Sequence, residues 1–166
     1  MDKEIIIAIA LGIGLSASAG FRVFLPLLIA GLAARLGFLP LNNSFLWLAS
    51  TPALAALSAA TIIEIIAYYV PFVDNLLDSI AMPLAIGAGT LLAASVLPVD
   101  NGFLKWLMAI VLGGGASATV QGATTALRLT SSGTTGGLGN PVISTGENAA
   151  AAGISILAIA LPILVL

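Results

Sequence analysis

The sequence contains no cysteine and no histidine. Without these side chains the chain cannot form a disulfide, bind zinc or haem through thiolate or imidazole, or move protons near neutral pH with an imidazole. This absence argues against a metalloenzyme or a redox carrier. We therefore expect no metal and no cofactor.

Charged residues are also scarce, with five basic and seven acidic side chains in 166 residues and a net charge of -2. So few cations leave no basic surface for nucleic acid. Hydrophobic residues make up 60% of the chain and the mean hydropathy is +1.17, which is not the composition of a water-soluble domain. We therefore expect a single transmembrane domain over residues 1–166, multi-pass in the cell (inner) membrane, with the lipid bilayer as its surroundings.

The long apolar runs predict an all-α bundle of about five membrane spans, because each helical crossing needs about 20 apolar residues. Glycine and serine interrupt two of these runs, 5–36 and 103–129, which we predict to be broken helices. Uninterrupted spans are expected at 52–70, 83–97 and 148–166, with a short interfacial or re-entrant helix over 71–80 and a polar stretch over 130–147.

The two broken segments resemble each other, since residues 11–18 and 112–119 both read L-G-x-G-x-S-A-[S/T]. This match predicts an internal repeat. If each broken segment crosses once, the two copies enter the membrane from opposite sides. We then expect an inverted repeat, as in many transporters, with a two-helix unit at about 5–70, a linking helix at about 83–97 and an inverted unit at about 103–166.

Ser16, Ser18 and Arg22 lie at the first interruption. Glycine and serine loosen a helix where its backbone polar groups can face a cavity instead of lipid. We predict that this segment is a helix break that faces the protein interior and forms part of a pathway for a solute or ion. In the alternative interpretation the small residues only let helices approach, and Arg22 reaches to a lipid headgroup.

A second candidate group comes from polar residues at helical spacing. Glu64 lies deep in the second predicted span, where an unpaired carboxylate is costly, and Arg22 and Arg128 are its available partners. We predict that Glu64 lies on the pathway and is neutralised either by one of these arginines or by a bound proton, although a buried pair can also serve structure alone. The polar stripe on the second broken segment consists of Ser117, Gln121, Thr124 and Arg128.

Further polar residues occur outside the predicted spans. Asp74, Asn75 and Asp78 would share one side of a helical turn, where they could bind a cation or simply lie at the membrane interface. Prenyl and phosphatidyl transferases have richer acidic motifs and basic phosphate clamps, so we expect no enzyme. Asn140 belongs to a glycine-rich stretch, TTGGLGNPVIS, that we predict to turn back toward the cavity.

Two expectations concern assembly and orientation. Small residues recur every fourth position at Ala81, Ala85, Gly89 and Ala93, a spacing that would let another helix or a second copy of the chain pack closely. With five crossings, Arg35 and Lys105 fall on one side and Lys3 on the other. The excess of cations on cytoplasmic sides then favours an N-terminus outside the cell.

Four stretches, SAGFRVFLPLLIAGLAARLG, WLASTPALAAL, VPFVDNLLDS and TTGGLGNPVIS, resemble a family of small bacterial integral-membrane proteins classed only as a domain of unknown function. The likeness covers nearly the whole chain. It implies a multi-span membrane protein built around Arg22, Asp74, Asn75, Asp78, Asn140 and Pro141, and it implies no particular substrate.

Together these patterns lead to two functional hypotheses. The first is a small transporter or channel for an anionic solute or headgroup, attracted by Arg22 and Arg128, with Glu64 carrying a coupling proton. The second is a non-catalytic membrane subunit or scaffold, in which the polar stripes only pack helices.

Overall fold

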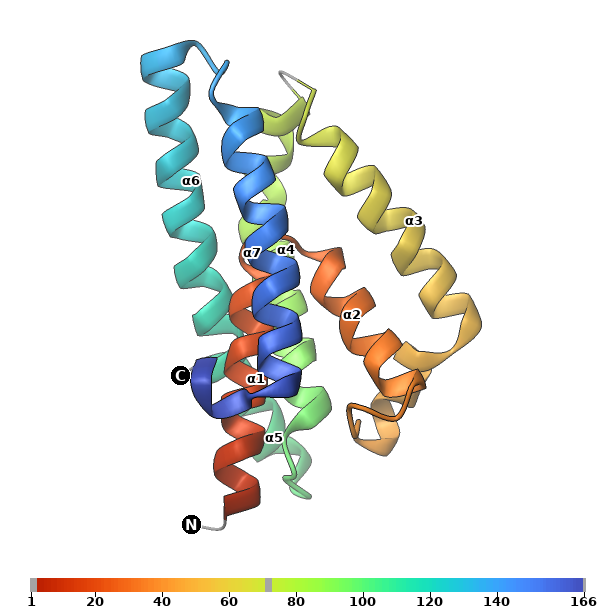
Figure 1. Ribbon diagram of the computed structural model, residues 1–166. Coiled ribbons are helices and arrows are strands. Elements are labelled where there is room, and N and C mark those ends of the chain that lie inside the picture. Colours follow the sequence, from red (N-terminus) through yellow and green to blue (C-terminus); the bar gives the residue numbers. More distant parts are fainter. Residues whose placement is uncertain (1–2, 71–72, 166) are drawn as a thin grey trace.

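The computed structural model describes residues 3–70 and 73–165, and every regular element in these residues is helical, as the apolar runs predicted (Figure 1). The helices are α1 (Lys3–Ala19), α2 (Phe24–Arg35), α3 (Thr51–Ala67), α4 (Val73–Val96), α5 (Gly102–Met108), α6 (Gly115–Thr135) and α7 (Asn140–Ala160). Short 3-10 helices are found at η1 (Asn43–Ala49) and η3 (Pro162–Val165), and η2 (Ala109–Gly114) is a π-helical turn.

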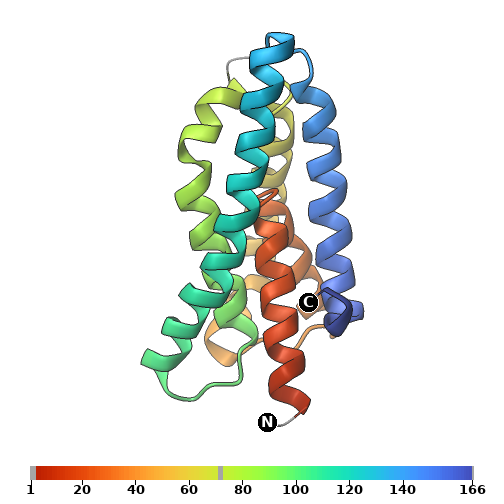
Figure 2. The same ribbon diagram turned by 90° about the vertical axis from the view of Figure 1, so that its left-hand side faces the viewer.

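Helices α1 and α2 form a hairpin, so the predicted break exists but the first apolar run does not cross from one end of the bundle to the other. Glu4 and Ile7, near the start of α1, line one pocket together with Pro40 and Asn42, which follow α2. The chain therefore returns to the end at which it started, and residues 20–23 form the tip of the hairpin (Figures 1 and 2).

The sequence explains how the end of α1 packs so closely against α4 and α6. The hydroxyl of Ser16 donates to the carbonyl of Gly12 (2.6 Å) and to that of Gly89 on α4 (2.7 Å), which ties the end of α1 to its neighbour. Gly20 passes so close to α6 that a Cβ atom would lie 2.6 Å from the carbonyl oxygen of Ser117. The glycine thus permits a backbone approach that any side chain would prevent.

The second interrupted run is one continuous helical rod, and our prediction of a break there is wrong. α5, η2 and α6 follow one another from Gly102 to Thr135 without a turn. The glycines at 113–115 fall where η2 passes into α6, and a π-helical turn accommodates them without breaking the helix.

The two similar motifs run in the same direction, so the predicted inverted arrangement is also wrong. Gly113 lies beside Ser16, and four residues later Ser117 lies beside Gly20, so α1 and α6 advance in parallel (Figure 2). The inversion was inferred from five crossings, and it fails because the first segment turns back. One local correspondence is preserved, since Ser117 also donates to the carbonyl four residues before it, that of Gly113 (3.0 Å).

Helix α4 occupies the centre of the bundle. It runs unbroken from Val73 to Val96 with Pro83 inside, in place of the separate helix expected over 71–80, of which residues 71 and 72 lie outside the described part. Transmembrane helices tolerate such a proline because neighbouring groups satisfy the freed backbone. Its small residues pack inside the protein against α1, η2 and α6. The expected dimer seam is therefore not available to a second copy, since its members Ala81, Ala85, Gly89 and Ala93 are all buried.

Three helical segments of the described chain are long and apolar enough to cross a membrane, namely most of α4, the rod from Gly102 to Thr135, and α7. The pair η1 and α3, which meet at an angle of 61°, would make a fourth. The difference from the five expected spans arises from the α1–α2 hairpin. α7 also begins at Asn140, before the predicted start at 148, so most of the polar stretch is helical. These helices identify a membrane protein.

Candidate functional site

Arg22 projects from the tip of the α1–α2 hairpin into the bundle, where its side chain is only 1% exposed. Its Nη1 lies 2.7 Å from Oε2 of Glu147 on α7, its Nε donates to Asn148 Oδ1 (2.6 Å), and its Nη2 donates to the carbonyl of Ser144 (3.2 Å). A further bond goes from Nη1 to the carbonyl of Phe21 (2.9 Å). The hairpin tip is thus attached to one face of α7.

Arg128 reaches the same carboxylate from α6. Its Nε donates to Glu147 Oε1 (3.0 Å) and its Nη2 to Glu147 Oε2. The same Nη2 also donates to the hydroxyl of Ser144 (3.0 Å). Two buried guanidinium groups therefore share one carboxylate.

Tyr68, which ends α3, completes this group. The guanidinium carbons of Arg22 and Arg128 lie 4.1 and 4.4 Å from the centre of its ring. A ring face attracts cations at such distances. We call Arg22, Arg128, Glu147 and Tyr68 the arginine cluster. It joins four parts of the chain: the hairpin tip, α3, α6 and α7.

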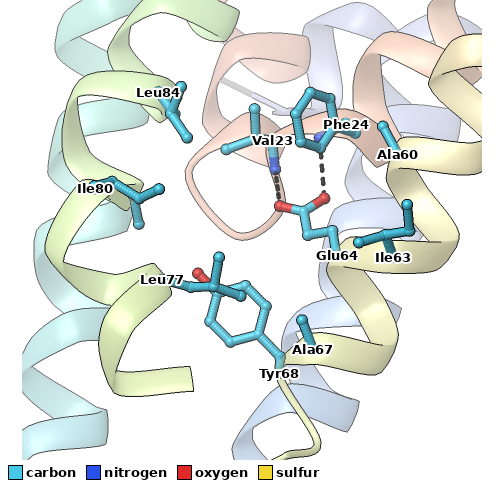
Figure 3. A pocket seen from close by; sticks show the side chains of 11 residues that line it. Val23, Phe24, Ala60, Ile63, Glu64, Ala67, Tyr68, Leu77, Ile80 and Leu84 are labelled. Carbon is cyan, nitrogen blue, oxygen red and sulfur yellow. Dashed lines mark hydrogen bonds between the residues drawn. The ribbon is translucent and has the colours of Figure 1, made fainter. Parts of the chain in front are cut away.

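Glu64 does not pair with either arginine, which corrects the prediction. Its carboxylate accepts hydrogen bonds from the backbone N–H groups of Val23 (2.8 Å) and Phe24 (3.1 Å) at the start of α2 (Figure 3). The first N–H groups of a helix lack partners within it and carry a partial positive charge. The break therefore supplies Glu64 with a backbone partner, whereas the sequence suggested a side chain.

Asp74 and Asp78 of α4 face the interior, not only the membrane interface. The amide nitrogen of Asn140 donates to Asp74 Oδ2 (2.8 Å) and to the hydroxyl of Ser132 (3.1 Å). Asp78 Oδ1 lies 4.0 Å from Arg128 Nε. The side chain of Asn75 is outside the described part of the structure. Within that part, no three His, Cys, Asp or Glu residues come close enough to hold a metal ion.

Several buried polar atoms near the arginine cluster have no hydrogen-bond partner among the residues that the structure describes. They are Arg128 Nη1, Asp78 Oδ1 and Asn140 Oδ1, and Thr61 Oγ1 on α3 is a fourth. Unsatisfied buried groups are costly, so native structures rarely keep them without water or a ligand. The cluster thus leaves one guanidinium donor available to a further acceptor.

The remaining predicted site residues are buried, and their hydrogen bonds lie within a helix or join two neighbouring helices. The hydroxyl of Ser18 accepts a bond from Ser155 on α7 (2.8 Å). Along α6, Thr124 donates to the carbonyl of Gln121 (3.0 Å), and Gln121 donates to Thr125 (3.3 Å). The predicted stripe of Ser117, Gln121, Thr124 and Arg128 does face the interior, but only Arg128 contacts Glu147.

The arginine cluster lies away from the end of the bundle at which the hairpin opens. Glu147 is seven residues after the start of α7 at Asn140, which places it about 10 Å from the opposite end at 1.5 Å per residue. The three cations outside the cluster, Lys3, Arg35 and Lys105, are all at the hairpin's open end (Figure 1). We expected Arg35 and Lys105 on one side of the membrane and Lys3 on the other, and this expectation is wrong.

No curated protein and no solved structure matches this chain. The model of one family, described as Domain of unknown function (DUF4126), matches residues 9–166. That range contains the hairpin tip and every residue of the arginine cluster, and it agrees with the resemblance seen in the four sequence stretches. The chain belongs to the DUF4126 family.

Proposed function

We propose that the protein is a multi-pass transporter of the cell (inner) membrane that carries a small anionic solute or headgroup, with the arginine cluster as its binding site. The observation that carries this proposal is the sharing of the Glu147 carboxylate by Arg22 and Arg128. Charged groups inside a membrane bundle are expensive and by default mark a pathway. A pair of guanidinium groups matches the oxygens of a carboxylate or phosphate.

Glu147 supplies the coupling to protons in this proposal. While ionised, its carboxylate occupies the two guanidinium groups. When Glu147 is protonated, or when it turns away, both arginines are free to bind the oxygens of an incoming anion. Release of the anion lets Glu147 ionise and return. We assign this role to Glu147 and not to Glu64, because the Glu147 carboxylate pairs with both arginines, whereas that of Glu64 accepts from backbone N–H groups.

The hairpin gives the site its position and its access. Non-helical backbone at membrane depth is stable only where protein or a water-filled cavity surrounds it, and such breaks often form transporter sites. We place Lys3, Arg35 and Lys105 in the cytoplasm by the positive-inside rule. Asp74 and Asn140 then lie on the route from the cluster to the external side.

One observation favours a second candidate, a non-catalytic subunit or scaffold. The N–H groups of Arg22 bond to Asn148, Glu147, Ser144 and Phe21. An arginine so fully bonded can fix the position of the hairpin without moving any solute.

Reconstitution into liposomes separates the two candidates. We expect wild-type protein to carry a radiolabelled small anion, such as phosphate or acetate, and we expect Arg128→Gln to abolish that flux. Arg35→Gln is the matched control, because this exposed arginine bonds only to Thr51 in the described structure. An absence of flux for every anion tried, with correctly folded protein in the vesicles, would favour the scaffold.

A further inference from the structure

A pocket opens sideways between α3 and α4, next to the arginine cluster. Its volume is about 250 Å³, and besides Glu64 and Tyr68 it is lined by apolar side chains, among them Phe24, Ile63 and Leu84. Figure 3 shows these residues around a space bounded by the start of α2 and the facing sides of the two helices. The pocket therefore has apolar walls and two polar members.

The rim of this pocket faces the membrane. Ile63 on α3 is 67% exposed, and Ile80 and Leu84 on α4 are 49% and 43% exposed. α3 packs mainly against α2 and η1, so a gap separates it from α4. Exposed apolar side chains on helices of a membrane bundle contact lipid tails. A molecule that enters from the side must therefore come from the bilayer.

The inner end of the pocket adjoins the cations. Tyr68 lines the pocket, and its ring also contacts the guanidinium groups of Arg22 and Arg128. Arg128 Nη1 is buried and has no hydrogen-bond partner in the described part of the chain. Glu64 is turned to the backbone of Val23 and Phe24, where two N–H groups offset its charge. Asp78 Oδ1 lies 4.0 Å from Arg128 Nε and offsets part of the positive charge, so Arg128 Nη1 is the hydrogen-bond donor that this end offers to an anion.

The long axis of the pocket fits the orientation of a lipid. Tyr68 and Leu77 are close to the end of α3 and the start of α4, toward one end of the bundle. Ala60 and Leu84 lie about two helical turns deeper, and this deeper part is apolar. A headgroup at the Tyr68 end would place its acyl chain along the deeper part.

From these contacts we propose that the pocket between α3 and α4 binds an anionic membrane lipid, with one acyl chain between the helices and the headgroup at Tyr68 beside the arginine cluster. This inference rests on the proposed function in one respect, because it names a lipid as the anion that reaches the cluster. Binding of the lipid does not itself require transport.

The test uses phosphatidylglycerol with a photoactivatable group on one acyl chain, added to the purified protein in detergent. We expect crosslinks on residues 60–68 and 77–84. Unlabelled phosphatidylglycerol should compete, and phosphatidylcholine should compete about tenfold less well. Glycerol 3-phosphate, which has the headgroup charge without a chain, should not compete. Crosslinks elsewhere, or competition by glycerol 3-phosphate equal to that of the lipid, would overturn the proposal.

Two neighbouring alanines provide matched variants. Ala60 lines the pocket, whereas Ala59 is exposed and lies outside it. Ala60→Trp fills the space and should reduce crosslinking about tenfold, while Ala59→Trp should leave it unchanged. If Ala60→Trp gives no folded protein by size-exclusion chromatography, Ile80→Trp fills the pocket from the α4 side. If a folded variant with a filled pocket crosslinks to the lipid as strongly as the wild type, the proposed site is refuted.

The lipid proposal and the transport proposal fail separately. Anion flux by the wild type together with crosslinks outside the pocket would overturn only the lipid site. Correct crosslinking without flux of a solute or lipid would overturn transport and leave the lipid site standing.

Discussion

Replacement of Glu147 by glutamine should destabilise the protein more than the same replacement of Glu64. In the structure the Glu147 carboxylate accepts bonds from three guanidinium nitrogens, Nη1 of Arg22 and Nε and Nη2 of Arg128. Glutamine has one acceptor oxygen and directs an N–H₂ group toward a cation. Loss of one partner from a buried ion pair costs about 3–5 kcal/mol. We expect Glu147→Gln to lower the free energy of unfolding by an amount in this range.

Glu64→Gln is the matched comparison, because the carboxylate of Glu64 bonds only to two backbone N–H groups in the described structure. The amide oxygen retains one of these bonds, so we expect a loss of about 1–3 kcal/mol. The assay is the free energy of unfolding, followed by circular dichroism in mixed micelles with increasing denaturing detergent. Equal losses in the two variants would refute the assignment of Glu147 as the shared counter-ion.

Formate extends this experiment to the proposed mechanism. If a solute anion takes the place of the Glu147 carboxylate, millimolar formate should raise the melting temperature of Glu147→Gln and leave that of Glu64→Gln unchanged. A purely structural ion pair in a closed site gives no such rescue.

Three further changes test the fold. Gly20→Ala should lower the free energy of unfolding by about 1–3 kcal/mol, because its Cβ would meet α6 at 2.6 Å, whereas Gly122→Ala, with its nearest side-chain atom at 3.8 Å, should be neutral or stabilising in the same assay. Asn42→Ala should lower the free energy of unfolding by about 1–3 kcal/mol, since the amide of Asn42 donates to two carbonyls at the end of α4 (both 2.9 Å). If the variant melts at the same temperature as the wild type, these two bonds are dispensable. Because the chain has no cysteine, single cysteines report topology: Phe38→Cys should react with an impermeant maleimide only from the cytoplasmic side and Leu138→Cys only from the outside, and labelling of both from one side would contradict the hairpin.

Composition and local pattern were sufficient to predict the all-helical fold and the break before Arg22. Glycine and serine next to an arginine in an apolar run leave few other structures at membrane depth. The same local pattern could not distinguish a broken span from a hairpin. That distinction depends on where residues 40–42 return, and only the contacts with the start of α1 and the end of α4 determine it.

The sequence reasoning found both arginines but missed Glu147, because it assigned 130–147 to a polar stretch outside the spans. A signal was present in the periodicity. Asn140, Ser144, Glu147 and Ala151 follow spacings of four, three and four, and all four are buried on one face of α7. Glu64 was assigned the wrong partner for a different reason, since a sequence pattern indicates charged side chains but not the unpaired N–H groups of a helix that starts nearby.

The most direct test of the account is anion uptake into liposomes under an imposed pH gradient, compared between wild type and Glu147→Gln at matched amounts of folded protein. If Glu147 carries the coupling proton, a pH gradient should accelerate anion uptake by the wild type. In Glu147→Gln, downhill anion flux should persist and become insensitive to the gradient, because the two arginines remain while the titrating carboxylate is gone. Uptake by Glu147→Gln that depends on the gradient as strongly as wild-type uptake would contradict the account.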